Sequence, residues 1–364
     1  MVLLIALACS SPEGSGPTPM MSAERLTFFD APWPSDDRLD EDGTIALSDF
    51  PDPVGGSLLE TWLAFGEQQV GFGTNAPLFL AFDGPLDLDD LPTPSASALR
   101  GSALVLVDVD PASPWRNQQH PVRWDWAAEP TAYHGGNLLS VQPLPGFPLR
   151  PGTTYALVVT TAIAARSPEV DRLLDQNASL VDALDFLEID AESVSAATVF
   201  TTTDPLDEMA RMARFVREDI ESPNLSLQLF LVREGVHFDV YRTHYPTPRF
   251  THGEAPYLTA GGGFEFASDG DPKIDGWDDM RLAVCVPKDR STAPAAGWAS
   301  AINQHGTGGD FLSHCDADDP AEVAGRLAAE GMVTLGIDQP LHGLRAGGSG
   351  GDLANFNVLN PHSG

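Results

Sequence analysis

The sequence predicts a multidomain protein in which an all-β sandwich is followed by an incomplete α/β domain. Between residues 77 and 202, short apolar runs rich in β-branched residues alternate with Gly, Pro and Asp, as is typical of short strands joined by turns. From Met280 onward the order becomes strand, glycine-rich loop, helix and strand, which indicates a βαβ unit. The length of 364 residues suits about two or three domains.

Composition restricts the classes of partner. The chain has 52 acidic and 20 basic residues and a formal net charge of −32 at pH 7. Such an acidic chain repels the phosphates of nucleic acids and the anionic surface of a membrane, so we expect no nucleic-acid partner. No apolar run reaches the roughly 18 residues that a membrane-spanning helix requires. The 34 Gly and 31 Pro are too few for a low-complexity chain.

The N-terminus combines a short apolar run with a polar tract. Residues 2–8 are apolar and end directly before Cys9. The tract that follows has no hydrophobic periodicity, and we expect a flexible tether over residues 10–22. Residues 1–9 resemble a bacterial lipoprotein signal. The resemblance implies export, acylation of Cys9 and a lipid anchor in a bacterial cell envelope, either in the outer membrane or facing the periplasm. The alternative is a buried N-terminal segment whose cysteine belongs to the core.

Residues 23–203 are predicted to form the β-sandwich region. Asp42-Gly43 between short apolar runs indicates a hairpin. The apolar spacing predicts a helix over 57–69 and a helical insert over 168–187. Strand patterns occupy residues 77–82, 103–109, 122–126, 137–141, 153–160 and 197–202. The order of a long loop, Pro-Gly, Thr-Thr-Tyr and an apolar strand resembles the immunoglobulin-like domains of exported bacterial proteins, over residues 70–203.

Residues 204–279 are predicted to be a helix and a connecting segment of mixed strand and loop (223–279), and residues 280–364 the N-terminal part of the α/β domain. Asp204 as N-cap and Pro205 at the first helical position favour a helix that runs to Arg217. The α/β part is predicted to contain strands at 280–286, 298–303 and 332–337, with a helix from Pro320 to Gly331 before the last strand.

A glycine-rich loop follows the second of these strands, with the residues His305, Gly306, Thr307, Gly308 and Gly309. Glycine lets bare backbone N–H groups approach a developing oxyanion, because no side chain intervenes. Together with Asp338-Gln-Pro-Leu-His342-Gly-Leu-Arg345, this stretch resembles the α/β-hydrolase family, in its branch of bacterial lipoprotein esterases and lipases. The resemblance implies a carboxylic-ester hydrolase for small-molecule esters or lipids that uses no cofactor. It also implies oxyanion-hole donors at Gly306, Thr307 and Gly308, with His305 orienting the loop. The alternative is a glycine-rich turn without function.

Asp338, His342 and Arg345 form a second candidate group. They follow a predicted strand directly, at the sheet edge where the sites of α/β proteins gather, and they are expected to border a pocket. The spacing of Asp338 and His342 suits catalysis or a metal. The alternative is that Asp338 and Arg345 tie down the loop while His342 lines the pocket wall, and we predict no metal.

The catalytic serine of such a hydrolase is not found. The one literal G-x-S-x-G surrounds Ser349, and it lacks the preceding apolar strand and the following helix of a nucleophile elbow. The remaining βα units need on the order of 100 residues, more than follow Gly351. We therefore expect the N-terminal portion of an exported, lipid-anchored serine hydrolase, truncated before its nucleophile and inactive as it stands. The rival hypothesis is a non-catalytic surface lipoprotein whose β domain binds a partner or carbohydrate.

Three further patterns are weaker candidates. Residues 38–49 have the spacing of a calcium loop, but Arg38 holds the first ligand position, so a hairpin is the better interpretation. Cys285 and Cys315 either form a disulfide or remain as two buried thiols. A cluster of aromatic residues suits a sugar-stacking platform or a strand face that is half core: Trp115, His120, Trp124 and Trp126.

Overall fold

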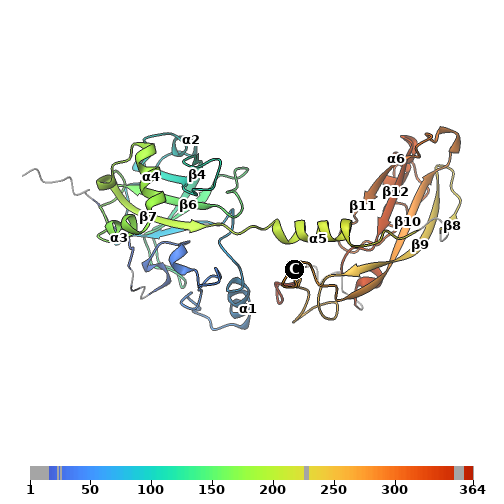
Figure 1. Cartoon of the computed structure of the whole chain (residues 1–364), viewed down its shortest axis with the longest axis horizontal. Coiled ribbons are helices and arrows are strands. Elements are labelled where there is room, and N and C mark those ends of the chain that lie inside the picture. Colours follow the sequence, from blue (N-terminus) through green and yellow to red (C-terminus); the bar gives the residue numbers. More distant parts are fainter. Residues whose placement is uncertain (1–15, 23, 25–26, 225–228, 348–355, 364) are drawn as a thin grey trace, which may run out of the picture. The chain divides into compact units, whose positions relative to one another are not determined.

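The computed structural model describes residues 16–22, 24, 27–224, 229–347 and 356–363. The chain forms two units, Met1–Leu206 and Asp207–Gly364, and each has its own β-structure (Figure 1). The described residues contain three sheets, so the protein is mostly β, which is consistent with the predicted β-rich domain.

Unit 1 (Met1–Leu206) contains two antiparallel sheets. The smaller has the strand order β1-β5-β4, and the larger has the order β3-β2-β6-β7. The strands are β1 (Leu78–Ala81), β2 (Leu104–Asp108), β3 (Gln119–His120), β4 (Val122–Ala127), β5 (Leu138–Pro143), β6 (Thr154–Thr160) and β7 (Val194–Thr201). The helices are α1 (Ser57–Gly66), α2 (Pro94–Ser97), α3 (Val170–Gln176) and α4 (Ala178–Leu187).

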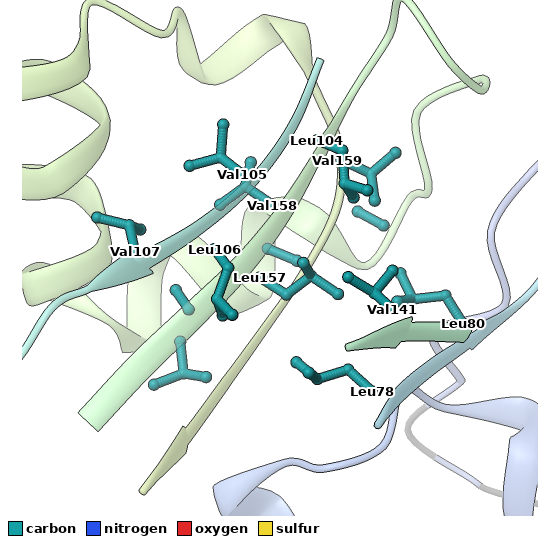
Figure 2. Packing of buried hydrophobic residues seen from close by; sticks show 14 of the residues in the cluster. Leu78, Leu80, Leu104, Val105, Leu106, Val107, Val141, Leu157, Val158 and Val159 are labelled. Carbon is teal, nitrogen blue, oxygen red and sulfur yellow. The ribbon is translucent and has the colours of Figure 1, made fainter. Parts of the chain in front are cut away.

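The core of unit 1 lies between the two sheets and continues on the far side of the larger one. Figure 2 shows Leu78, Leu80 and Val141 of the smaller sheet beside Leu157 of β6. β2 is buried along its whole length, because alternate residues of a strand face opposite ways and both faces are covered. Val105 points away from the smaller sheet, toward the helices α3 and α4 (Figure 2).

The predicted strands of unit 1 are confirmed, with small changes at their ends. β7 begins at Val194, because the one-turn helix Ala191–Ser193 leads directly into it. The helical insert consists of two helices because Asn177 leaves the helical region (φ −127°, ψ 76°), and its side-chain amide donates to the Leu173 carbonyl at 2.8 Å. The hairpin at Asp42-Gly43 is also present, closed by a bridge between Leu39 and Ile45.

His120 gives unit 1 a pH dependence. Its side chain packs against Tyr155 with ring centroids 5.2 Å apart, and within the described part of the chain its Nε2 is buried without a hydrogen-bond partner. Burial, reinforced by the charge of Arg150, lowers the pKa of His120 below its ordinary value of 6.5. Below pH 6.5 the unfolded chain therefore takes up a proton that the folded unit resists. The contribution to stability is complete above that pH and is lost as the pH falls.

We expect His120→Gln to remove this part of the pH dependence. In the native chain, the free energy of unfolding of unit 1 should fall by up to about 1.4 kcal/mol per pH unit through this single group. Urea unfolding between about pH 7.5 and 5, compared for the native chain and the variant, measures the difference. Parallel stability curves for the two proteins would show that His120 is not the titrating group.

Unit 2 (Asp207–Gly364) is built on a five-stranded sheet of order β11-β12-β10-β9-β8. β11 and β12 are parallel and connected through α6, whereas the other neighbours are antiparallel. The elements are α5 (Asp207–Glu218), β8 (Phe230–Arg233), β9 (Phe238–Arg249), β10 (Gly276–Pro287), β11 (Ala299–Asn303), α6 (Val323–Ala329) and β12 (Met332–Ile337). The predicted strand–loop–helix–strand order of this region is confirmed.

The segment 204–279 is more than the predicted helix and connecting segment. It supplies β8, β9 and the start of β10 to the same sheet as the β11-α6-β12 unit. Proline normally interrupts a strand, so Pro246 and Pro248 make β9 difficult to recognise as a strand from the sequence. They are tolerated because β8 pairs with β9 only at residues 240–242, which leaves the other edge of β9 without a ladder at both prolines.

The two faces of β10 differ in their cover. Ala283 and Cys285 face a fully buried cluster that includes Phe311 and residues of α6. The opposite face carries Leu282, Val284 and Val286, which pack with half-buried neighbours of β12: Val333, Leu335 and Ile337. This second face is therefore apolar but incompletely covered within unit 2.

Candidate functional site

The loops after β11 and β12 lie together at one edge of the sheet of unit 2. The two strands are parallel neighbours, with Asn303 opposite Gly336, so their carboxyl ends share that edge. The loop after β11 contains the 305–309 motif, and residues 338–345 follow β12. The fold thus brings the two sequence motifs into contact.

Residues Gly306–Gly309 form a tight turn. The Gly309 amide donates to the Gly306 carbonyl at 3.0 Å, and Gly308 has a φ of 78°. Since Thr307 keeps a negative φ, the turn is of type II, in which the third position requires the left-handed region and favours glycine. A Cβ on Gly309 would lie 2.9 Å from the imidazole of His305, so this position also requires glycine.

His305 and His342 hold the turn against the loop after β12. Nε2 of His305 accepts from the Gln339 amide at 3.2 Å, and its Nδ1 donates to the Gly306 carbonyl at 2.9 Å. Nε2 of His342 accepts from the Gly308 amide at 3.3 Å, and its Nδ1 donates to the Pro340 carbonyl at 2.9 Å. The ring centroids lie 4.8 Å apart. Because a backbone N–H group occupies each Nε2, both imidazoles act as positioning residues and neither is a free base.

The turn exposes backbone donors. Gly306 and Thr307 are exposed, and within the described part of the chain their N–H groups donate to no protein acceptor. The resemblance also placed a donor at Gly308, but that N–H group donates to His342 instead. The loop can therefore offer two N–H groups to an anion, at Gly306 and Thr307.

Asp338 is a buried hub beneath these loops. Its side chain is 1% exposed and accepts two hydrogen bonds from Arg281, at 2.6 and 2.9 Å, and one from the Phe311 amide at 3.2 Å. The hydrogen bond with Asp338 raises the pKa of the Arg281 guanidinium. Because its oxygens are taken, Asp338 does not serve as the free acid or metal ligand that its spacing to His342 suggested.

Asp338 and Arg345 both tie down the loop after β12, as one alternative predicted, but their side chains do not pair with each other. The Arg345 side chain pairs with Asp278 at 3.1 Å and donates to the backbone carbonyl of Asp338 at 3.2 Å. The Asp338 carboxylate binds Arg281 instead, because β10 and β12 are adjacent strands, with Leu282 opposite Ile337. Arg345 still fastens the loop, but through other partners.

A cavity of about 520 Å³ opens beside the loop after β12. Of the three residues expected to border a pocket, Arg345 lines it, whereas Asp338 and His342 do not. The remaining wall includes Arg249 at the end of β9, and Thr251 and Tyr257 from the segment that follows it. Gly306 and Thr307 do not line this cavity, so the exposed amides and the cavity are separate features of unit 2.

Sequence reasoning missed this cavity because segments remote in sequence build its wall. Asn357 donates to the Tyr257 carbonyl at 3.1 Å, and Asn360 donates to the carbonyls of Tyr257 at 2.7 Å and Gly261 at 2.9 Å. Both asparagines are buried and need such partners. The one sign of this cavity wall in the sequence is the pair of asparagines in a short turn-forming stretch. The sequence does not show which backbone carbonyls they bind.

Cys285 and Cys315 are both buried and both free, so the disulfide alternative is not formed in the structure. The hydrogen bond between the two thiols raises the pKa of Cys285 and lowers that of Cys315, whose thiol also contacts His314. The Nε2 of His314 lies 3.4 Å from the Cys285 sulfur. The sequence placed these cysteines on separate segments and gave no sign that a histidine joins them.

The calcium-loop pattern and the aromatic cluster predicted from the sequence do not form binding sites in the structure. The Arg38 guanidinium takes both oxygens of Asp49, at 2.7 and 3.2 Å, so the last position of the calcium pattern is an ion-pair partner. Trp124 and Trp126 pack against the core and His120 is buried, which leaves Trp115 as the one exposed ring of that set. Cys9 and Ser349 lie outside the described residues.

Comparisons with known proteins give no family. No family model and no curated protein matches the sequence. The N-terminal part of the bacterial S-layer protein SbsC matches at 10% identity over 59% of this chain and 38% of that chain, with a TM-score of 0.18. A structure of domains 1–6 of SbsC matches at 9% identity over 60% of this chain and 22% of that chain, also with a TM-score of 0.18. The chain therefore spans well under half of the length of these structures, and a TM-score of 0.18 does not establish a shared fold.

None of the helices within the described ranges is long and apolar enough to cross a bilayer.

Proposed function

We propose that unit 2 is the N-terminal part of an α/β-type serine hydrolase for carboxylic esters, in which the turn Gly306–Gly309 supplies part of the oxyanion hole. The observation that carries the proposal is the pair of exposed N–H groups at Gly306 and Thr307, on a turn held by two histidines. In α/β hydrolases such donors come from the loop between the third strand and the following helix. β11 is the fourth strand of this sheet in chain order, or the third when the short edge strand β8 is set aside, and its loop leads to α6.

The catalytic serine belongs on a strand beside β11. The oxyanion hole of this family combines a loop N–H group with that of the residue after the nucleophile, so both must reach the same oxygen atom. β12 occupies one side of β11, and the other edge of β11 is unpaired among the described residues. Ile302 on β11 is 66% exposed, and the unpaired edge of a strand favours pairing with a further strand.

The chemistry assigned to these residues is electrostatic. When a serine Oγ attacks an ester, the carbonyl oxygen gains negative charge in the tetrahedral intermediate. The N–H groups of Gly306 and Thr307 would donate to that oxygen, while His305 and His342 keep the turn in place. No described residue is assigned as the general base or as its acid partner. A small-molecule ester or a lipid is the proposed substrate, and no cofactor is required.

The proposal extends to the cell envelope. Acylated Cys9 would anchor the protein to a bacterial membrane, and unit 1 would serve as an immunoglobulin-like spacer or a module that presents substrate. Two antiparallel sheets of three and four strands that share one core support the immunoglobulin-like assignment. Binding of carbohydrate by unit 1 is not favoured, because its tryptophans do not form one exposed platform.

The test is to sequence the coding region past codon 364 and to assay the complete product. We expect a strand–GxSxG–helix pattern, and hydrolysis of a short-chain p-nitrophenyl ester that is lost when the serine of that pattern is replaced by alanine. A stop codon directly after codon 364, or a complete product without esterase activity, would overturn the proposal. Assay of the 364-residue chain with Ser349→Ala is the matched control, because activity that depends on Ser349 would place the nucleophile elsewhere than beside β11.

A further inference from the structure

A second cluster of reactive side chains lies in unit 2. It consists of Cys285 on β10 and of His314 and Cys315 in the loop between β11 and α6. One ligand atom from each residue lies within 4.8 Å of the other two, and all three residues are buried. A tetrahedral zinc ion with sulfur at about 2.3 Å and nitrogen at about 2.0 Å needs ligand atoms roughly 3.5–3.8 Å apart. The trio is therefore already close to that spacing, although it comes from two separate segments.

The backbone of β12 is shaped to admit the imidazole of His314. A Cβ on Gly336 would clash with the backbone carbonyl of Phe311 and would lie 2.5 Å from Cε1 and 2.6 Å from Nδ1 of His314, so a side chain at this position would displace both the loop and the ring. The backbone of His314 is held by α6, because the Ala324 amide donates to the His314 carbonyl at 3.0 Å. Glycine at 336 thus leaves room for both the Phe311 carbonyl and the His314 ring against the sheet.

Ordinary hydrogen bonding does not explain why this histidine is buried. His314 is 1% exposed, and its Nδ1 has no partner within the described residues, while its Nε2 faces the sulfur of Cys285 at 3.4 Å. Buried polar groups are costly unless they are paired, and a thiol is a weak partner. The hydroxyl of Thr334, directly opposite Cys285 in the strand register, is also buried, and within the described part of the chain it has no partner other than the Cys285 thiol.

We propose that Cys285, His314 and Cys315 bind a soft divalent metal ion, with zinc as the best match. Two thiolates and one imidazole form a ligand set that zinc accepts, and the two negative charges balance the ion inside an apolar cluster. The fourth position would hold a water molecule or another small ligand near the Thr334 hydroxyl. Bound metal would fasten β10 to the loop that begins with the turn Gly306–Gly309, and this role does not depend on ester hydrolysis.

The test uses the full chain with Cys9→Ser, without a polyhistidine tag and under reducing conditions. Titration with Co²⁺ should give thiolate-to-cobalt charge-transfer absorption that saturates at one ion per chain and is displaced by Zn²⁺. We expect Cys285→Ala, Cys315→Ala and His314→Gln each to abolish this absorption. His237→Gln, which removes an exposed imidazole outside the cluster, should leave it unchanged.

A second measurement covers variants that fold poorly. In the Cys9→Ser chain itself, Zn²⁺ should raise the melting temperature of unit 2 and a chelator should reverse the shift, since a ligand that binds the folded state stabilises it. Absence of cobalt absorption and of a zinc-dependent shift in the folded chain would overturn the proposal. A Cys285–Cys315 disulfide in protein purified without reductant, with no metal bound after its reduction, would also overturn it.

Discussion

Replacing Asp338 by Ala is expected to lower the free energy of unfolding of unit 2 by about 3–5 kcal/mol. The carboxylate is 1% exposed, pairs with Arg281 through two hydrogen bonds and accepts the Phe311 amide. Its removal leaves the partly buried Arg281 guanidinium without its counter-charge and the Phe311 amide without an acceptor. Urea unfolding, followed by hydrogen exchange of peptides from β10 and β12, measures the loss in unit 2 alone.

The control for Asp338 is Asp279→Ala on the same sheet. Asp279 pairs with His244, but both side chains are more than half exposed, so its loss should cost about 0–1 kcal/mol. The double variant with Arg281→Ala should lose much less than the sum of the two single changes, because both remove the same interaction. Equal losses for Asp338→Ala and Asp279→Ala would contradict the role of Asp338 as a buried hub.

Elements that depend on local patterns could be predicted from the sequence. β2 and β6 are apolar runs between turn residues, and β12 follows a helix that ends before Gly331. The positions of these strands could therefore be predicted from the apolar pattern and from the Gly and Pro residues that flank it. β9 could not be predicted in the same way. Its prolines argue against a strand. Its pairing with β10 at every position from Phe238 to Arg249 depends on the tertiary structure and cannot be seen in the local sequence.

The candidate site was only partly predictable for the same reason. The glycine pattern indicated a turn with bare amides, and the turn is present with Gly308 in the left-handed region. Which amides stay free depends on His342, a residue from another loop that takes the Gly308 donor. The partners of Asp338 and the Cys285–His314 contact likewise depend on which strands are neighbours, and residue spacing does not encode that.

Thr307→Pro is the second change for which we expect a large effect, and it depends on the proposed hydrolase function. Proline removes the backbone N–H group of residue 307 and fixes φ at about −65°. That conformation suits the second position of a type II turn, so the turn Gly306–Gly309 should persist. Loss of one oxyanion donor typically lowers kcat by about 10²- to 10³-fold.

The most direct test of the oxyanion assignment is therefore the kcat of the complete hydrolase with Thr307→Pro beside Thr307→Ala. The alanine variant loses the same side chain but keeps the N–H group, so it controls for the side chain itself. The assignment predicts a kcat about 10²- to 10³-fold lower for the proline variant, and a kcat near that of the native enzyme for the alanine variant. Equal kcat values for both variants and the native enzyme, with unchanged folding, would contradict it.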